Sequence, residues 1–367
     1  MAKLGEVCLL KAGKFVSAND ISPEYNKGLY PCFGGNGIRG YVADYTHDGK
    51  FPLIGRQGAL CGNVNLASGK FHATEHAVVV QPKIEMNVQW LYYALNAMNL
   101  GQYATGAAQP GLAVSKLETL SIEIPNISEQ NKIAQNLYKV EQLVSVRKQQ
   151  LAKLDELVKA RFVEMFGDSK LNPNNFPCYS LSEYIVFLTS GSRGWSQYFT
   201  DSGEYFITIK NVKNCKITLQ DVQYVAPPDN AEAKRTRVQE NDLLISITAD
   251  LGRTGVVTKE IAEHGAYINQ HLTCIRLEQD KLNPLYVAYY MESDAGKEQF
   301  VAKNQSAVKA GLNFNAINSL KLMVPPLSLQ NQFAAFVERV EQQGQTVQQS
   351  LEKLELMKKA LMQEYFG

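Results

Sequence analysis

The residue patterns that could support catalysis or cofactor binding lack the neighbours that such chemistry needs. Residues 35–40 read Gly-Asn-Gly-Ile-Arg-Gly and match the G-x-G-x-x-G pattern of dinucleotide sites. Such a site needs a strand before the glycines and a helix after them, so that the pyrophosphate meets a helix N-terminus. Here Cys32-Phe-Gly-Gly precedes the pattern, and the β-like segment Gly40-Tyr-Val-Ala follows it. The segment therefore predicts a glycine turn.

The other catalytic and metal-binding patterns are incomplete. Three Gly-Lys pairs are each followed by Phe, whereas a P-loop needs Ser or Thr there. His72 and His76 have the spacing of zinc ligands on a helix, but the following Val78-Val-Val favours a strand. Both Asn-Pro pairs lack the second proline of the Asn-Pro-Pro-aromatic motif of amino-methyltransferases. We therefore predict no catalytic residue and no metal site.

What remains are loop side chains suited to base edges and phosphates. Arginine can donate in a fork to guanine O6 and N7, while Asn and Gln can pair with adenine N6 and N7. Any one of them alone is more often a solvated loop side chain or a turn former. As a set they predict nucleic-acid contacts. The candidates are Asn36, Arg39, Arg56, Gln57, Asn63, Asn65 and Gln109 in the first half of the chain, and Arg193, Trp195, Arg253, Asn269, Gln270, His271, Lys309, Asn313 and Asn315 in the second.

Bulk properties neither demand nor exclude this function. The net charge of +1 gives no overall attraction to nucleic acid, although a local basic cleft needs only a few Lys and Arg. Six cysteines are scattered without a C-x-x-C pair, so neither a disulfide framework nor a zinc site is indicated. There is no apolar run of membrane-spanning length and no signal-peptide core near the start, so we expect a cytoplasmic protein without membrane association.

The loops are carried by a chain that repeats itself at a spacing of 200 residues. Residues 122–167 align without a gap on residues 322–367. Chance similarity between two helices would preserve apolar spacing, but it would hardly preserve polar identities in one register. We infer a duplicated unit. The identical pairs include Pro125/Pro325, Ser128/Ser328, Gln130/Gln330, Asn131/Asn331, Glu141/Glu341, Lys153/Lys353, Phe166/Phe366 and Gly167/Gly367.

Each copy predicts one long helix, with Ser128 or Ser328 as N-cap and a terminal Phe-Gly. Apolar residues recur about every 3.5 positions, so each helix must bury a narrow stripe against another helix. We expect the two helices to form an antiparallel coiled coil with pseudo-two-fold symmetry, and their length of roughly 55–60 Å suits a spacer. The seam residues are Ile133, Leu137, Val140, Val144, Leu151, Leu154 and Val158 in the first copy, and Phe333, Val337, Val340, Val347, Leu351, Leu354 and Leu361 in the second. Arg147, Arg161, Gly344 and Lys358 interrupt the seam.

The expected architecture is a mixed α/β (α+β) chain of two globules, each followed by a long helix. Its boundaries are 1–125 for the first globule, 126–167 for the central helix, 168–325 for the second globule and 326–367 for the C-terminal helix. Strands are expected at residues 40–43, 51–54, 77–81, 120–124, 205–209, 243–247, 255–258 and 272–277. The globules share an aromatic helix and a Gly-Leu pair at 111–112 and 311–312, but their loops differ.

The repeated segments 124–134 (Ile-Pro-Asn-Ile-Ser-Glu-Gln-Asn-Lys-Ile-Ala) and 324–334 (Val-Pro-Pro-Leu-Ser-Leu-Gln-Asn-Gln-Phe-Ala) each lead into a helix that ends in Phe-Gly. This arrangement resembles the conserved regions of type I restriction–modification DNA specificity (S) subunits, across the whole chain. The resemblance implies a non-catalytic reader with two target-recognition domains, each reading one half of a bipartite double-stranded DNA target. It also implies two modification (methyltransferase) subunits as partners and, with them, restriction subunits. S-adenosylmethionine, ATP and Mg would belong to the partners, and the chain itself would need no cofactor.

Two other interpretations remain open from the residues. The chain could be a single-chain DNA-modifying or DNA-cleaving enzyme whose catalytic site is unrecognised, or a coiled-coil scaffold without a DNA role. Incubation of the pure chain with DNA, magnesium and S-adenosylmethionine distinguishes the enzyme from the specificity subunit.

Overall fold

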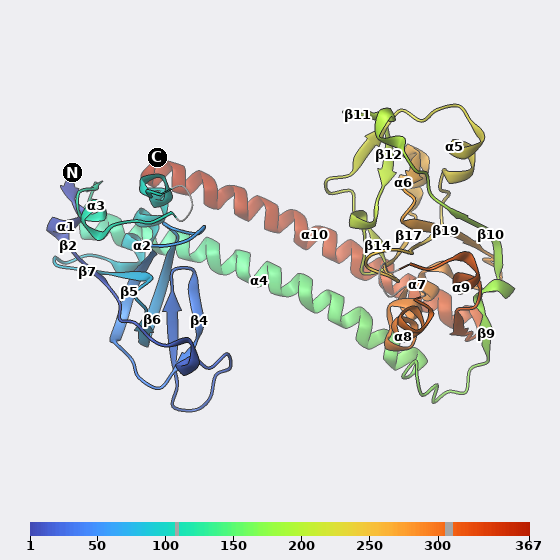
Figure 1. The fold of residues 1–367 in the computed structure, drawn as a ribbon, viewed down its shortest axis with the longest axis horizontal. Coiled ribbons are helices and arrows are strands. Elements are labelled where there is room, and N and C mark those ends of the chain that lie inside the picture. Colours follow the sequence, from blue (N-terminus) through green and yellow to red (C-terminus); the bar gives the residue numbers. More distant parts are fainter. Residues whose placement is uncertain (107–109, 305–310) are drawn as a thin grey trace. The chain divides into compact units, whose positions relative to one another are not determined.

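The computed structural model describes residues 1–106, 110–304 and 311–367. These residues form two compact units (Figure 1). Unit 1 comprises Met1–Gln149 together with Gln348–Gly367, and unit 2 comprises Gln150–Val347. Both units combine strands and helices, as the sequence predicts, and each contains one part of each long helix. Within the described residues, no helix is long and apolar enough to cross a membrane.

Unit 1 is built on a six-stranded sheet with the strand order β2-β7-β5-β6-β3-β4 (Figure 1). Its strands are β2 (Cys8–Ala12), β3 (Tyr30–Gly34), β4 (Gly37–Val42), β5 (His47–Gly55), β6 (Val64–Ala73) and β7 (Ala77–Pro82). Its short helices are α1 (Leu4–Val7), α2 (Val88–Ala97) and α3 (Val114–Glu118), and β1 (Ala2–Lys3) pairs with β8 (Ser121–Ile122). The aromatic helix α2 packs on the sheet and contributes Trp90 and Tyr93 to the core. The predicted glycine turn lies at residues 35–36, between β3 and β4, and residues 37–40 are the start of β4.

Unit 2 contains two four-stranded sheets. One has the order β10-β19-β16-β17, formed by β10 (Ile185–Ser190), β19 (Leu272–Leu277), β16 (Leu243–Ser246) and β17 (Thr254–Val256). The other has the order β11-β15-β12-β18, formed by β11 (Phe199–Thr200), β15 (Gln223–Val225), β12 (Glu204–Ile207) and β18 (Ala266–Ile268). Two further pairs are β13 (Val212–Lys213) with β14 (Lys216–Ile217), and β9 (Cys178–Ser180) with β20 (Lys321–Met323). The helices are α5 (Ala231–Thr236), α6 (Lys259–His264), α7 (Pro284–Glu292), α8 (Asp294–Lys303) and α9 (Phe314–Asn318).

The two long helices are α4 (Ile127–Phe166) and α10 (Leu327–Phe366). The predicted N-caps, Ser128 and Ser328, are wrong, because both serines lie inside the first helical turn. The side chain of Asn126 caps α4 instead, and its Oδ1 accepts a hydrogen bond from the Glu129 amide at 3.0 Å. At the other end Gly167 takes a left-handed conformation with φ +79° and its amide donates to the Val163 carbonyl, as the Phe-Gly ending predicts.

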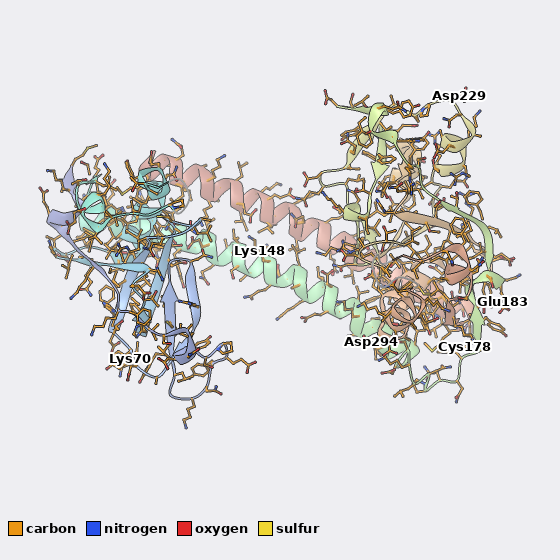
Figure 2. All side chains as sticks on the ribbon, viewed as in Figure 1. Lys70, Lys148, Cys178, Glu183, Asp229 and Asp294 are labelled. Carbon is orange, nitrogen blue, oxygen red and sulfur yellow. The ribbon has the colours of Figure 1, made fainter. Side chains whose placement is uncertain are left out.

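The helices pair antiparallel, and this is visible separately inside each unit. In unit 1 the first part of α4 contacts the last part of α10 through four side-chain pairs, one of which contains Lys148, labelled in Figure 2. The pairs are Asn136 with Tyr365 (3.1 Å), Glu141 with Lys358 (2.7 Å), Arg147 with Ser350 (3.1 Å) and Lys148 with Glu355 (2.8 Å). In unit 2, Phe162 and Phe166 pack against Phe333 with ring centroids 5.4 and 5.6 Å apart. All of the predicted seam residues are buried or half-buried.

The polar interruptions of the seam have partners of their own. Lys358 is paired with Glu141, whose second oxygen accepts a hydrogen bond from the Tyr93 hydroxyl at 2.7 Å. In unit 2 the corresponding Glu341 lies 3.5 Å from the Lys216 ammonium. Burial raises the pKa of Glu341, and the nearby Lys216 opposes that rise. Lys358 therefore makes an ion pair with the opposite helix, and this contact favours one register of the pair.

Candidate nucleic-acid interface

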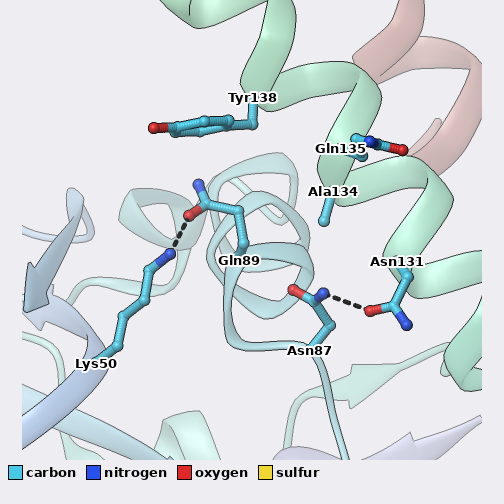
Figure 3. A pocket seen from close by; sticks show the side chains of 7 residues that line it. All are labelled: Lys50, Asn87, Gln89, Asn131, Ala134, Gln135 and Tyr138. Carbon is cyan, nitrogen blue, oxygen red and sulfur yellow. Dashed lines mark hydrogen bonds between the residues drawn. The ribbon is translucent and has the colours of Figure 1, made fainter.

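The duplicated polar residues at the start of α4 attach the first globule to the helix. The Gln130 side chain is only 2% exposed; its Oε1 accepts from the Asn87 amide at 2.9 Å, and its Nε2 donates to the Pro125 carbonyl at 2.8 Å. The Asn87 side chain donates to Asn131 Oδ1 at 2.6 Å, drawn in Figure 3. Asn87 also caps α2, because its Oδ1 accepts from the Trp90 amide. We call Asn87, Pro125, Gln130 and Asn131 the unit 1 bracket.

The start of α10 carries the same arrangement in unit 2. Gln330, 0% exposed, accepts from the Asn283 amide at 2.9 Å and donates to the Pro325 carbonyl at 2.7 Å. The Asn283 side chain donates to Asn331 at 2.9 Å and caps α7. We call Asn283, Pro325, Gln330 and Asn331 the unit 2 bracket. The polar identities in the repeat therefore preserve a bracket that holds the aromatic helix of each globule.

The shared Gly-Leu pair fixes a loop at the end of a core strand in both units. In unit 1 the Leu112 amide donates to the Arg56 carbonyl at 2.9 Å, directly after β5. In unit 2 the Leu312 amide donates to the Ile247 carbonyl at 2.9 Å, directly after β16. The next residue, Gln57 or Thr248, forms a bridge with the glycine of the pair. Gln57 and Thr248 thus occupy equivalent positions on a shared frame.

In unit 1 this loop presents side chains without internal partners. Arg39, Arg56 and Gln57 form no side-chain hydrogen bond or ion pair with the described residues. Arg56 Nε is moreover buried and has no partner among those residues. A buried donor left unsatisfied in the free protein is costly, so a ligand acceptor would satisfy it. Arg39 is exposed on β4, and Arg56 and Gln57 follow β5.

The amides predicted in unit 1 lie beside this loop. Asn63 donates to Asn36 Oδ1 at 3.1 Å, which joins the loop after β5 to the β3–β4 turn. Asn65 lies on β6 next to Gly37, and its buried Nδ2 has no partner among the described residues. Gln109 lies outside the described residues.

In unit 2 three of the predicted residues, Arg193, Gln270 and His271, are joined to Thr248 in a chain of hydrogen bonds. Arg193 Nε donates to Gln270 Oε1, and Gln270 Nε2 lies 3.3 Å from His271 Nε2. His271 Nδ1 lies 2.7 Å from the hydroxyl of Thr248. Asn269 supports the same turn, because its Oδ1 accepts from the His271 amide. Four residues from three loops therefore form one connected group, which we call the Arg193–Thr248 chain.

Main-chain contacts hold these loops together. The Ser192 amide donates to the Ile268 carbonyl, and the Gln270 amide donates back to Ser192, both at 2.9 Å. A Cβ at Gly191 would lie 2.1 Å from the Asn269 carbonyl oxygen, so this close approach requires glycine. The Ile247 amide also donates to the His271 carbonyl at 2.9 Å. The Arg193–Thr248 chain is therefore set in a rigid frame.

The remaining candidates of unit 2 have separate roles. Arg253 pairs with Asp250, three residues earlier. Asn313 caps α9 through its Oδ1, and Asn315 is exposed in the same helix. Lys309 lies outside the described residues.

Trp195 departs from its expected role at a base edge. It is only 3% exposed, stacks on Phe206 at 5.8 Å and hydrogen-bonds Glu232 through its indole nitrogen. Its role in this structure is core packing, because a base could not reach the ring. The His72 ring is likewise buried, with its two nitrogens facing the Asp44 and Lys14 carbonyls. Among the described residues no group of three or more His, Cys, Asp or Glu side chains is placed to hold a metal ion.

Sequence reasoning missed Thr248 and the bracket residues Asn87 and Asn283. Thr248 follows a core strand and has no charged or amide side chain, so nothing in its type distinguished it. The Asn residues precede the aromatic helices at matching positions, 87 and 283, which was the available signal.

The chain is similar to known proteins of one family. A family model described as the type I restriction modification DNA specificity domain matches residues 1–156 and 193–356. The type I restriction enzyme EcoprrI specificity subunit of Escherichia coli is 52% identical over 143 residues, which are 39% of this chain and 36% of that protein. A putative type I specificity subunit of Haemophilus influenzae is 36% identical over 113 residues, 30% of this chain and 29% of that protein. The chain thus spans about a third of the length of these two relatives.

A solved structure is similar over the whole chain. The type I restriction-modification S subunit from M. genitalium superposes with a TM-score of 0.67 at 17% identity, covering 100% of this chain and 95% of that one. At this identity the likeness concerns the fold alone. Because the family model matches well over half of the residues, the chain belongs to the type I restriction modification DNA specificity family.

Proposed function

We propose that the chain is the DNA-reading specificity subunit of a type I restriction–modification complex and has no catalytic activity of its own. Each globule reads one half of a bipartite target in double-stranded DNA. The observation that carries the proposal is the repeated bracket, which holds two globules in the same way while their loops present different side chains. A constant frame with variable Arg, Asn, Gln and Thr loops suits base reading at two different half-sites.

The near-neutral charge of the chain suits a protein that shares phosphate contacts with partners. Both long helices keep large apolar side chains exposed, which favours docking of other subunits. We propose that two modification subunits bind there and supply the S-adenosylmethionine site, and that restriction subunits supply ATP hydrolysis with Mg. The exposed side chains are Leu143, Val146, Leu157 and Val163 on α4, and Leu356 and Met357 on α10.

The test is methylation of a DNA library by the chain together with its modification partner. Methylated sequences should share two short half-sites separated by an unread gap of constant length. Arg56→Ala should relax only the first half-site, by about 1–3 kcal/mol if the contact is a fork to one base. Equal relaxation of both half-sites would contradict the assignment of one globule to each half-site.

The pure chain should neither methylate nor cut DNA when S-adenosylmethionine and magnesium are supplied. Activity without a partner would establish the alternative, a single-chain enzyme. Absence of any sequence preference in the assembled complex would favour the scaffold instead.

A further inference from the structure

The Arg193–Thr248 chain has only one self-consistent direction of hydrogen bonding. Arg193 Nε can only donate, so the atom that faces it must be the amide oxygen of Gln270. The amide nitrogen of Gln270 therefore faces His271 Nε2 at 3.3 Å and donates to it. Nε2 must then be the unprotonated nitrogen of a neutral ring, whose proton sits on Nδ1.

This direction determines what Thr248 can offer. His271 Nδ1 donates to the Thr248 hydroxyl oxygen across 2.7 Å and occupies one of its lone pairs. The hydroxyl proton is not used in that bond. Thr248 is partly exposed, and its hydroxyl forms no other side-chain hydrogen bond with the described residues. Because a hydroxyl that accepts a hydrogen bond becomes a better donor, the chain leaves an oriented donor at its end.

The position of Thr248 points to recognition rather than to structure alone. It matches Gln57 of unit 1, since each residue follows a core strand and bridges the glycine of the Gly-Leu pair. Gln57 is exposed, and its amide has no hydrogen-bond partner among the residues that the structure describes. The two units thus place a different hydrogen-bonding group at the same point of a common frame.

We propose that Thr248 is a specificity-determining residue of unit 2, whose hydroxyl donates to an acceptor on a base edge of the second half-site. The acceptors available in the major groove are purine N7, guanine O6 and thymine O4. Gln270 and His271 are positioning residues for this hydroxyl. Arg193 fixes the amide of Gln270 while its terminal nitrogens, on an exposed side chain, stay available for DNA. The inference rests on the proposed reading of DNA by unit 2.

The experiment is methylation of a library randomised at both half-sites by the complex with the modification subunit. Thr248→Val removes the hydroxyl with little change of shape, and it should reduce the preference at one base position of the second half-site by about tenfold. Thr248→Ser, which restores the hydroxyl, should recover that preference. Gln57→Ala is the matched variant, and it should alter only the first half-site.

A double variant tests the chain itself. Gln270→Ala should reduce the preference at the same base position, and it should cause no further loss there in the Thr248→Val background. Additive losses would show that Gln270 does not act through Thr248 and would overturn the positioning role.

The outcomes separate this inference from the proposed function. Suppose that the unaltered complex is sequence-specific while the Thr248→Val complex has the same base preferences, or methylates all sequences less by the same factor. In either case Thr248 does not read a base. If the unaltered complex methylates without any sequence preference, the proposed function fails instead. Melting temperatures of all variants identify any loss that comes from unfolding.

Discussion

Replacing Gln330 by alanine tests whether the unit 2 bracket holds the globule to its helix. The side chain is fully buried and satisfies two main-chain groups, the Asn283 amide at 2.9 Å and the Pro325 carbonyl at 2.7 Å. In Gln330→Ala both groups lose their partner. A buried group left without a hydrogen bond costs about 1–3 kcal/mol, so with two such groups the free energy of unfolding should fall by about 2–6 kcal/mol.

The assay combines urea unfolding with hydrogen exchange of the main-chain amides. Protection should fall first at Asn283 and in the first turn of α7, because these amides depend on the bracket. The matched control is Gln332→Ala, two positions along the same helix on an exposed side chain, which should change the free energy of unfolding by less than about 0.5 kcal/mol. If Gln330→Ala behaved like this control in both measurements, the bracket would not be a structural attachment.

Three further predictions address the helix pair. Leu351→Glu places a charge at a seam position that is 6% exposed, so it should cost at least about 2–5 kcal/mol in urea unfolding and impair assembly with the modification subunit. Four residues inserted after Ala134 add about 6 Å of helix, so methylation mapping should find a longer gap between unchanged half-sites; changed half-sites with a constant gap would refute the spacer role. Burial raises the pKa of the Glu341 carboxyl. At pH values between its ordinary and its raised pKa, the folded chain therefore holds a proton that the unfolded chain has lost. The free energy of unfolding should fall as pH rises through that window. In Glu341→Gln this part of the pH dependence should disappear from unfolding curves measured across pH, whereas an unchanged slope would contradict it.

The long helices and the main strands could be predicted because their signals are local. A 3.5-residue apolar repeat needs only neighbouring positions, and strands were found at all eight predicted places. The ten-residue strand β6 (Val64–Ala73) was missed, since its Ala, Ser and Gly residues have little strand preference. Pairing with β5 and β3 on its two sides stabilises it as a strand, and that information is not local.

The residue types of the candidate interface could be predicted, but the hydrogen bonds between them could not. Arg193 and Gln270 are 77 positions apart, so no pattern in the sequence pairs them. Trp195 was predicted from its type to contact a base, but it is buried in the core. The type of an aromatic residue does not show whether its ring packs inside the protein or contacts a ligand. The N-cap error has a simpler cause: Asn126 and Ser128 are both good caps, and the proline before them did not decide between the two.

The repeated bracket also has a consequence for how new target preferences can arise in evolution. Asn87 and Asn283 lie inside the globules, whereas their partners Gln130, Asn131, Gln330 and Asn331 lie in the duplicated helices. Any globule that brings an Asn before its aromatic helix therefore meets the same amide groups. Recombination between related genes within the duplicated segments would deliver a foreign globule with its attachment intact. If the globules read DNA as proposed, such an exchange would change one half of the target while the hydrogen bonds of the bracket are retained.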